Sequence, residues 1–333
     1  MIPTSNEQLR ASESGRLPKV ENVRDDLVAV PQGMPHSSPP YSFSYLLIDA
    51  DERVHVIDPG WDTDENWERL IDTLSVRRLS PEAIASITVT HFHRDHVGMA
   101  ERVRNASGAP IVAHRVERSS GSAHASTGAI EARAQWDEWG VPENRRAELE
   151  PAVEERMAVP APTVDREVDD GDRLDVAGAA LRVVWTPGHT RGHVCVVDPD
   201  RHVVLTGDHV LPTVFSGLGL GGSTPTNPVA DYVTSLDVIE RYDDCEVLPG
   251  HGYRFHGLAE RAAACREHQL RRSREVAAVL ADGGEPSTWE IASRLTWTAG
   301  WDALHDFFLY SALSQTAMHR EFVESPEFAA YAG

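Results

Sequence analysis

Three histidines and an aspartate fall within six consecutive positions of the sequence, at His91, His93, Asp95 and His96. If the backbone is still extended between His91 and His93, these two side chains point to the same side and can bind one metal ion. Asp95 and His96 come after the turn and are placed to serve a second ion. Neutral imidazole and carboxylate groups are suited to zinc, and also to iron or manganese. The alternative, a solvated polar loop, leaves the density of metal-ligating side chains unexplained.

The elements on either side place this segment on a loop. Residues 86–89 form a short β-branched run that predicts a buried strand. Residues 99–103 predict a helix that stops near Gly108. In α/β proteins, chemistry is usually located on such loops between the end of a strand and the start of a helix.

The segment from His91 to His96 resembles the H-x-H-x-D-H signature of the metallo-β-lactamase superfamily. Three later segments resemble further motifs of this family, in the family's order and each at the end of a strand-like run: T-P-G-H-T at 186–190, G-D-H at 207–209 and P-G-H-G at 249–252. Asp58, in a D-P-G segment, resembles the first motif, whose aspartate usually orients the metal-binding loop by hydrogen bonds and binds no metal. The resemblance covers roughly residues 20–260.

The resemblance implies a site for two divalent metal ions per chain. It assigns His91, His93 and His189 to the first ion, Asp95, His96 and His251 to the second, and Asp208 to both. Zinc is our first expectation for the metal, with iron or manganese as alternatives. A hydroxide shared by the two ions would attack a carbonyl or phosphoryl centre. Asp95 and Asp208 are the carboxylates expected to take part in catalysis.

Other polar residues near these motifs are candidates for contacts to the substrate or to the metal ligands. His114 ends the predicted strand 110–114, and His209 follows Asp208 directly, where it could line a pocket or point into the fold. Tyr253 lies just past the last motif. His193 follows the third motif as in the family's pattern, and we expect it to support the structure rather than bind metal.

Composition limits the classes of function. Lys+Arg is 31 and Asp+Glu is 52, so the formal net charge is −21. Nucleic-acid-binding proteins usually present a basic face, so the charge disfavours a nucleic acid partner. The arginine clusters at 145–146 and 271–274 have acidic neighbours, which indicates local ion pairs. The three cysteines, Cys195, Cys245 and Cys265, form no disulfide framework and are expected to be free core thiols.

The sequence also bears on the compartment. Residues 1–16 are polar and carry no apolar h-region, so we expect no secretory signal. No run of about 18 apolar residues is present, so we expect no membrane span. These features favour a soluble cytoplasmic protein.

The expected fold class is α/β, and the resemblance implies a four-layer αβ/βα metallo-β-lactamase sandwich. We expect a flexible N-terminal tail at 1–18, the sandwich at 19–257 and a helical C-terminal region at 258–333. The insertion at 115–163 has a helical pattern, with Trp136 and Trp139 on one helical face. A lid or a dimer surface is favoured over a passive excursion for it. A homo-oligomer, a dimer or higher, is the expected assembly.

Asp208 argues against a true β-lactamase, because those enzymes generally have cysteine or histidine at this position. The pattern is closer to the hydroxyacylglutathione hydrolase, lactonase and nuclease branches. The favoured function is therefore hydrolysis of an ester, thioester, lactone or related bond in a small molecule. The alternatives are an endoribonuclease, disfavoured by charge, and a non-hydrolytic iron-dependent relative. The loops at 31–42, 115–163 and 211–227, which should select the substrate, carry no signature that identifies it.

Overall fold

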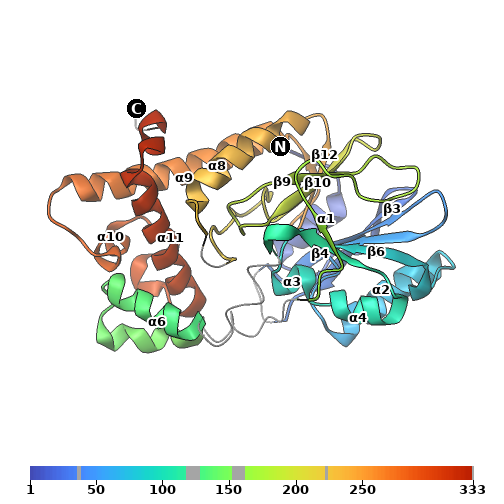
Figure 1. The fold of residues 1–333 in the computed structure, drawn as a ribbon, viewed down its shortest axis with the longest axis horizontal. Coiled ribbons are helices and arrows are strands. Elements are labelled where there is room, and N and C mark those ends of the chain that lie inside the picture. Colours follow the sequence, from blue (N-terminus) through green and yellow to red (C-terminus); the bar gives the residue numbers. More distant parts are fainter. Residues whose placement is uncertain (36–38, 118–127, 152–161, 222–223, 332–333) are drawn as a thin grey trace.

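Two β-sheets pack face to face in the computed structural model of the chain, with helices on the outer side of each sheet (Figure 1). The structure describes residues 1–333 except 36–38, 118–127, 152–161, 222–223 and 332–333. One sheet has six strands, in the order β1-β13-β12-β11-β10-β9, and the other has seven, in the order β2-β3-β4-β5-β6-β7-β8. This architecture confirms the predicted four-layer αβ/βα sandwich.

The strands are short, and two of them overlap the strands predicted at 86–89 and 110–114. The six-stranded sheet contains β1 (Ile2–Pro3), β9 (Arg182–Trp185), β10 (Val194–Asp198), β11 (Val203–Gly207), β12 (Glu246–Pro249) and β13 (Phe255–His256). The seven-stranded sheet contains β2 (Glu21–Arg24), β3 (Leu27–Gly33), β4 (Tyr41–Ile48), β5 (Val54–Ile57), β6 (Ile84–Thr88), β7 (Ile111–His114) and β8 (Arg166–Val168).

Helices occupy three parts of the chain. The sandwich carries α1 (Asn6–Ser14), α2 (Asp64–Val76), α3 (Arg94–Val97), α4 (Ala100–Ser107) and α8 (Pro228–Ile239). The insertion contains α6 (Gly128–Glu138) and a 3₁₀ turn at Glu143–Glu148. The C-terminal region contains α9 (Leu258–Ala281), α10 (Thr288–Arg294) and α11 (Asp306–Glu324). The helix α10 begins at a capping box, in which Ser287 and Glu290 bond each other's backbone N–H groups.

Alternation along the strands builds three apolar layers. Successive side chains of a strand point to opposite faces of its sheet. In β10, Val194 and Val196 belong to the core between the two sheets, and Cys195 and Val197 belong to the core beneath the outer helices. A continuous apolar run therefore marks a strand buried on both faces, as in β10 and β11.

The outer cores fix the helices on the sheets. Leu70 and Leu74 of α2 pack with Val103 of α4 on the outer face of the seven-stranded sheet. Leu236 of α8 and Leu258 of α9 pack on the outer face of the six-stranded sheet. All three cysteines are buried and free, as expected. Among the described residues, no helix combines the length and the apolar character needed to span a bilayer.

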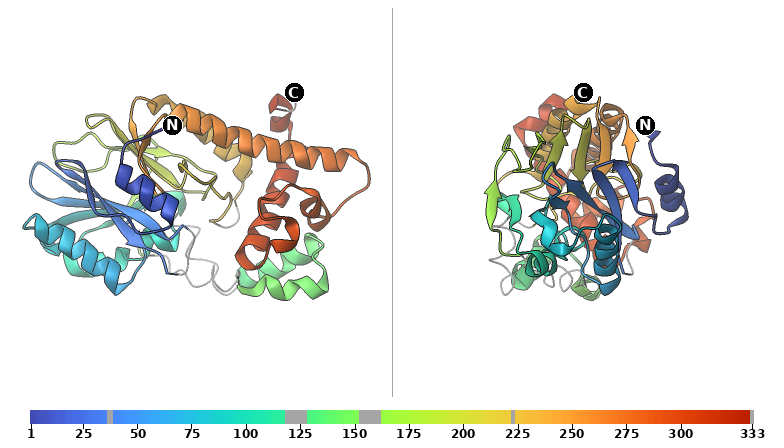
Figure 2. Two further views of the ribbon diagram at one scale, coloured as in Figure 1. Left: turned by 180° about the vertical axis from the view of Figure 1, so that it is seen from behind. Right: turned by 90° about the vertical axis from the view of Figure 1, so that its right-hand side faces the viewer.

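The insertion packs on the C-terminal helices at one end of the molecule. The ribbon views show α6 beside α11, with α9 running from the sandwich toward them (Figures 1 and 2). Trp136, Trp139 and Leu149 of the insertion form one apolar cluster with Leu309 and Leu313 of α11. The two tryptophans thus share a buried face, as their spacing indicates.

We expect Trp136→Ala to lower the free energy of unfolding by about 3 kcal/mol, because the indole is buried in this cluster and its removal leaves a cavity. Denaturant unfolding followed by circular dichroism measures the change. The metal content should stay at the wild-type value. An unchanged unfolding midpoint would show that the insertion does not pack on the C-terminal helices.

The N-terminal segment corrects one expectation. Residues 1–18, expected to be a flexible tail, contain β1 and α1, and β1 pairs with β13. The side chain of Ser5 caps α1 by accepting a hydrogen bond from the backbone of Gln8. The side-chain oxygen of Gln8 in turn accepts one from the backbone of Arg254, 3.0 Å away. The segment is ordered by these distant partners, which its own polar composition does not reveal.

Candidate metal centre

The predicted ligands lie at one edge of the sandwich. β5, β6, β11 and β12 end there, and β9 points the same way because it is antiparallel to β10, which is antiparallel to β11. The loops that follow these strands carry the motifs of the sequence analysis, so their side chains meet although they lie up to 160 residues apart, from His91 to His251. The carboxyl ends of strands are the usual place for such a site.

The first group of ligand atoms comes from His91, His93, His189 and Asp208, whose atoms all lie within 4.8 Å of one another. His93 Nδ1 lies 3.0 Å from His91 Nε2 and 3.0 Å from His189 Nε2. The Nε2 atoms of His91 and His189 are 3.3 Å apart. Three imidazole nitrogens therefore converge on one point, which is the arrangement of a His₃ metal site.

The second group consists of Asp95, His96 and His251, again with atoms within 4.8 Å of one another. Asp95 Oδ2 lies 3.0 Å from His251 Nε2 and 3.5 Å from His96 Nε2. His96 and His251 are buried, whereas Asp95 and the first group's His93 are half-buried. Within the described residues, the site is therefore partly exposed to solvent on the side of Asp95 and His93.

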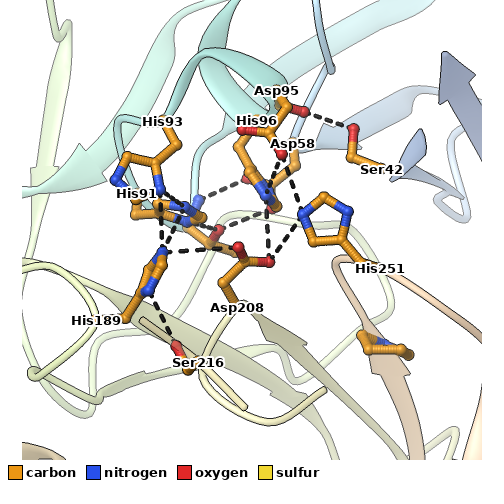
Figure 3. Close-up of polar contacts among 12 residues, drawn as sticks. Ser42, Asp58, His91, His93, Asp95, His96, His189, Asp208, Ser216 and His251 are labelled. Carbon is orange, nitrogen blue, oxygen red and sulfur yellow. Dashed lines mark hydrogen bonds and ion pairs between the residues drawn. The ribbon is translucent and has the colours of Figure 1, made fainter. Parts of the chain in front are cut away.

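Asp208 lies between the two groups (Figure 3). One carboxylate oxygen, Oδ2, is 3.6 Å from His189 Nε2 in the first group. The other oxygen, Oδ1, is 3.3 Å from His96 Nε2 and 3.3 Å from His251 Nε2 in the second. Each oxygen thus faces a different group, as required of a carboxylate that bridges two cations.

Unpaired polar atoms show that these residues fit metal ions. His96 Nε2 and Asp208 Oδ1 are buried and form no hydrogen bond to any described residue. A buried polar atom without a partner is costly, and a cation held by nitrogen and carboxylate oxygen would satisfy both atoms. The donor set of imidazoles and carboxylates suits zinc, iron or manganese.

Hydrogen bonds on the far side of the rings orient two of the histidines. His189 Nδ1 donates to the carbonyl oxygen of Gly217, 2.7 Å away. His251 Nδ1 donates to the carbonyl oxygen of Tyr41, also 2.7 Å away. A proton held on Nδ1 leaves Nε2 bare, so each ring presents a lone pair to its group. The loop after the fourth motif, at 211–227, therefore supports a ligand through Gly217.

Asp58 orients the loop that carries His91 to His96 through hydrogen bonds. Its Oδ1 accepts the backbone N–H of Thr90 at 2.7 Å, and its Oδ2 accepts the Thr90 hydroxyl at 2.8 Å. The same Oδ2 lies 2.9 Å from His96 Nδ1. The Thr90 hydroxyl also lies 3.0 Å from His91 Nδ1, so the contacts of Asp58 reach a histidine of each group. These contacts are the ones that the family resemblance implies for this aspartate.

The electrostatics of the two groups differ. Burial lowers the pKa of His93 to about 3, with His189 adding to the effect, so the first group holds neutral imidazoles. Burial also disfavours a charged His251, but the carboxylates of Asp208 and Asp95 outweigh it and raise its pKa to about 10. The second group therefore favours positive charge, which a divalent cation would supply.

Three further candidates lie outside the two groups that the described residues form. His114 is buried and stacks on Trp185, with ring centroids 5.3 Å apart. His209 is buried against Tyr232, with centroids 5.0 Å apart, and so points into the fold. Tyr253 packs against the apolar cluster of the six-stranded sheet. Contact of these side chains with a substrate stays a prediction.

His193 lies beneath Asp208. Its Nδ1 contacts the hydroxyl of Thr186 at 2.9 Å, and its Nε2 accepts the backbone N–H of Asp208 at 3.2 Å. The ring is fully buried, and both of its nitrogens are used by these contacts. His193 therefore positions the loop of Asp208, as a supporting residue would.

We expect His193→Ala to lower the thermal unfolding midpoint while the protein still binds the wild-type number of metal ions in excess metal, because the buried ring fills space and supports a backbone. Calorimetry and elemental analysis measure the two quantities. Loss of one metal ion without a change in stability would mean that His193 is a metal ligand and not a supporting residue.

The sequence analysis missed the carboxylate of Glu117. It follows β7 at the same edge of the sandwich and bonds to the backbone of Phe92, between His91 and His93. The sequence pattern places this position in the insertion at 115–163. An acidic residue three positions after the predicted strand 110–114 is the signal that could have revealed it.

Comparisons with known proteins point to one family. The family model of the metallo-beta-lactamase superfamily matches residues 38–251. A beta-lactamase-like protein 2 homolog of Caenorhabditis elegans is 24% identical over 294 residues, 86% of this chain and 82% of that protein. Hydroxyacylglutathione hydrolase GloC of Haemophilus influenzae is 26% identical over 218 residues, 62% of this chain and 84% of that protein.

The similarity extends to the whole fold. The crystal structure of a metallo-beta-lactamase family protein from Thermus thermophilus superimposes with a TM-score of 0.73 at 25% identity, covering 91% of this chain and 94% of that chain. The chain therefore belongs to the metallo-beta-lactamase superfamily. It is a metal-dependent hydrolase of that superfamily, which confirms the predicted family and the predicted class of enzyme.

Proposed function

We propose that the protein is a dinuclear hydrolase that cleaves an ester, thioester, lactone or related bond in a small molecule. The observation that carries this proposal is the position of Asp208, whose two oxygens face two separate groups of ligand atoms. A carboxylate that chelates a single ion would direct both oxygens at one set of ligand atoms, whereas Oδ1 and Oδ2 of Asp208 face different sets.

In this proposal His91, His93 and His189 would hold one divalent cation, Asp95, His96 and His251 would hold the other, and Asp208 would serve both groups. Bound cations would lower the pKa of a water molecule and polarise the carbonyl group of the substrate. Asp208 keeps the two groups at a fixed separation. The half-burial of Asp95 and His93 leaves the approach of the substrate on their side. Zinc is the first candidate for both positions, with iron or manganese as alternatives.

Thioesters are the first substrates to test. The relative from Haemophilus influenzae carries the name hydroxyacylglutathione hydrolase and covers 62% of this chain. Identity of 26% supports a shared type of reaction, while the loops that select the substrate differ between relatives.

The arginine clusters support a small substrate rather than RNA. Arg145 lies 2.5 Å from Glu148, and Arg146 lies 2.6 Å from Asp137. In the second cluster Arg272 lies 3.1 Å from Glu275. Arginines neutralised by nearby carboxylates offer little charge to a phosphate backbone, whose binding needs several free cationic groups. A neutral or weakly charged carbonyl compound fits this surface better.

A panel of thioesters, lactones and aryl esters, assayed beside labelled single-stranded oligoribonucleotides at low salt, tests the proposal. We expect the metal-loaded protein to hydrolyse at least one carbonyl substrate and to leave the RNA intact. Asp208→Ala identifies contaminating activity, because cleavage by this site must disappear in that variant. Cleavage of RNA that is lost in Asp208→Ala would overturn the proposal in favour of a nuclease.

A further inference from the structure

Glu117 joins the two loops that supply the histidines of the first group. Its side chain is 1% exposed, and both of its carboxylate oxygens accept hydrogen bonds. Oε1 accepts the backbone N–H of Phe92 at 2.8 Å. Oε2 accepts the hydroxyl of Thr190 at 3.0 Å and the backbone N–H of Gly192 at 2.8 Å. One carboxylate thus links two segments that are about 100 residues apart, counted from Phe92 to Gly192.

The bonded residues adjoin the ligands of one group. Phe92 lies between His91 and His93, and Thr190 directly follows His189. All three histidines of the first group are therefore next to a residue that Glu117 holds. The second group depends on other contacts, among them those from Asp58 to His96 and from Tyr41 to His251.

The approach of the two segments leaves no space for another side chain. A Cβ atom at Gly192 would lie 2.4 Å from the backbone nitrogen of Glu117 and 2.6 Å from its Oε2. Contacts this short do not occur between real atoms, so only glycine fits there. The glycine in the T-R-G-H segment is thus explained by the carboxylate that packs on it.

A buried carboxylate at this position must be stabilised by hydrogen bonds, because burial disfavours its charge. Burial raises the pKa of Glu117, and the hydrogen bonds from Phe92, Thr190 and Gly192 oppose this effect. Three donors from two loops require an acceptor with two oxygens in one plane, which an amide cannot provide. The geometry therefore requires a carboxylate at this position.

We propose that Glu117 is a positioning residue that sets the distance between the loop of His91 and His93 and the loop of His189, and so determines the affinity of the first group for its metal ion. The inference rests on the proposed dinuclear function, and it assigns to Glu117 an effect on one of the two groups only.

Glu117→Gln tests this role with almost no change in size. Whichever way the amide is turned, its NH₂ group faces at least one donor, so at least one loop is released. We expect the affinity of the first group for zinc to fall by about 10- to 100-fold, the range typical for loss of a residue that orients metal ligands. The affinity of the second group should keep its wild-type value.

Competition between the metal-free protein and a chromophoric zinc chelator measures the two affinities. His189→Ala, which lacks a ligand of the first group, and His251→Ala, which lacks one of the second, assign the two binding steps. Glu246→Gln is the matched control. Glu246 is also a buried carboxylate, 3% exposed, but it is the first residue of β12 and bonds Arg254 and Arg24. Its replacement should lower stability and leave both affinities unchanged.

The outcomes separate the role of Glu117 from general destabilisation. Weaker zinc binding at the first group alone in Glu117→Gln supports the inference. Wild-type affinity at both groups, or equal weakening at both groups, would overturn it. If Glu117→Gln does not fold, Thr190→Val is tested in its place. It removes one donor to the carboxylate and should weaken zinc binding at the first group alone. A wild-type protein that binds one ion only would contradict the dinuclear function, while the effect of Glu117 on that ion would still be measured.

Discussion

Asp208→Ala is expected to reduce kcat/KM by on the order of 10³-fold or more, which corresponds to about 4 kcal/mol of the activation barrier. The reason is geometric. Each oxygen of Asp208 faces a different ligand group, so the variant loses a ligand from both groups at once. The second group then retains only Asp95, His96 and His251. We expect the bound metal to fall below the wild-type amount even in excess metal.

Steady-state kinetics and elemental analysis on the same preparation measure both effects, and circular dichroism establishes that the fold is retained. Asp198→Asn is a suitable control. Asp198 is also a buried aspartate, 1% exposed, but it pairs with Arg201 at 2.7 Å on the loop after β10. Its replacement should leave metal content and turnover unchanged. Full turnover with a full complement of metal in Asp208→Ala would refute the bridging role.

Asp58→Asn should have the next largest effect, a loss of about 10- to 100-fold in metal affinity at the second group. Asp58 has a positive φ of 53°, a conformation that asparagine tolerates, so the backbone should be retained. The carboxylate accepts a hydrogen bond from His96 Nδ1, at 2.9 Å. An amide NH₂ in that place would donate to Nδ1 instead and shift the ring proton to Nε2. That nitrogen faces the second group and would no longer be free to bind.

This variant differs from Asp208→Ala in a measurable way. Because all seven ligand side chains remain, excess metal should restore much of the activity of Asp58→Asn, whereas it should not rescue Asp208→Ala. Activity titrated against free zinc distinguishes the two. If Asp58→Asn shows the wild-type titration curve, then the contact to His96 does not control the ring proton and our account of Asp58 fails.

The motifs predicted the location of the site because each is local in sequence. The ligand residues follow the ends of short apolar runs, and the strand direction at a sheet edge then brings them together. In β10 and β11 continuous apolar runs mark strands buried on both faces, because side-chain direction has a fixed period of two. The seven side chains are thus gathered as two groups from information within a few short segments.

Contacts between distant segments could not be predicted in this way. Gln8 looks like a surface residue until Arg254 is brought beside it. Glu117 looks like the start of an insertion until Phe92 and Gly192 approach it. Neither periodicity nor turn chemistry reports such pairs, because their partners are set by the tertiary fold.

The sequence does not predict the substrate, for a related reason. The metal ligands lie at the ends of strands, whereas substrate specificity depends on loops, whose sequences show no regular pattern. Parts of those loops, at 36–38, 118–127, 152–161 and 222–223, lie outside the described residues. The expected lid or dimer surface at 115–163 therefore remains a prediction, although its described helix packs on α11.

Titration of metal-free protein with zinc, followed both by binding and by hydrolysis of a thioester, tests the central claim most directly. Our account predicts that two ions bind per chain and that hydrolysis reaches its maximum only when the second ion is bound, because Asp208 contacts both groups. Saturation at one ion per chain with full activity, or full activity without any bound metal, would contradict it.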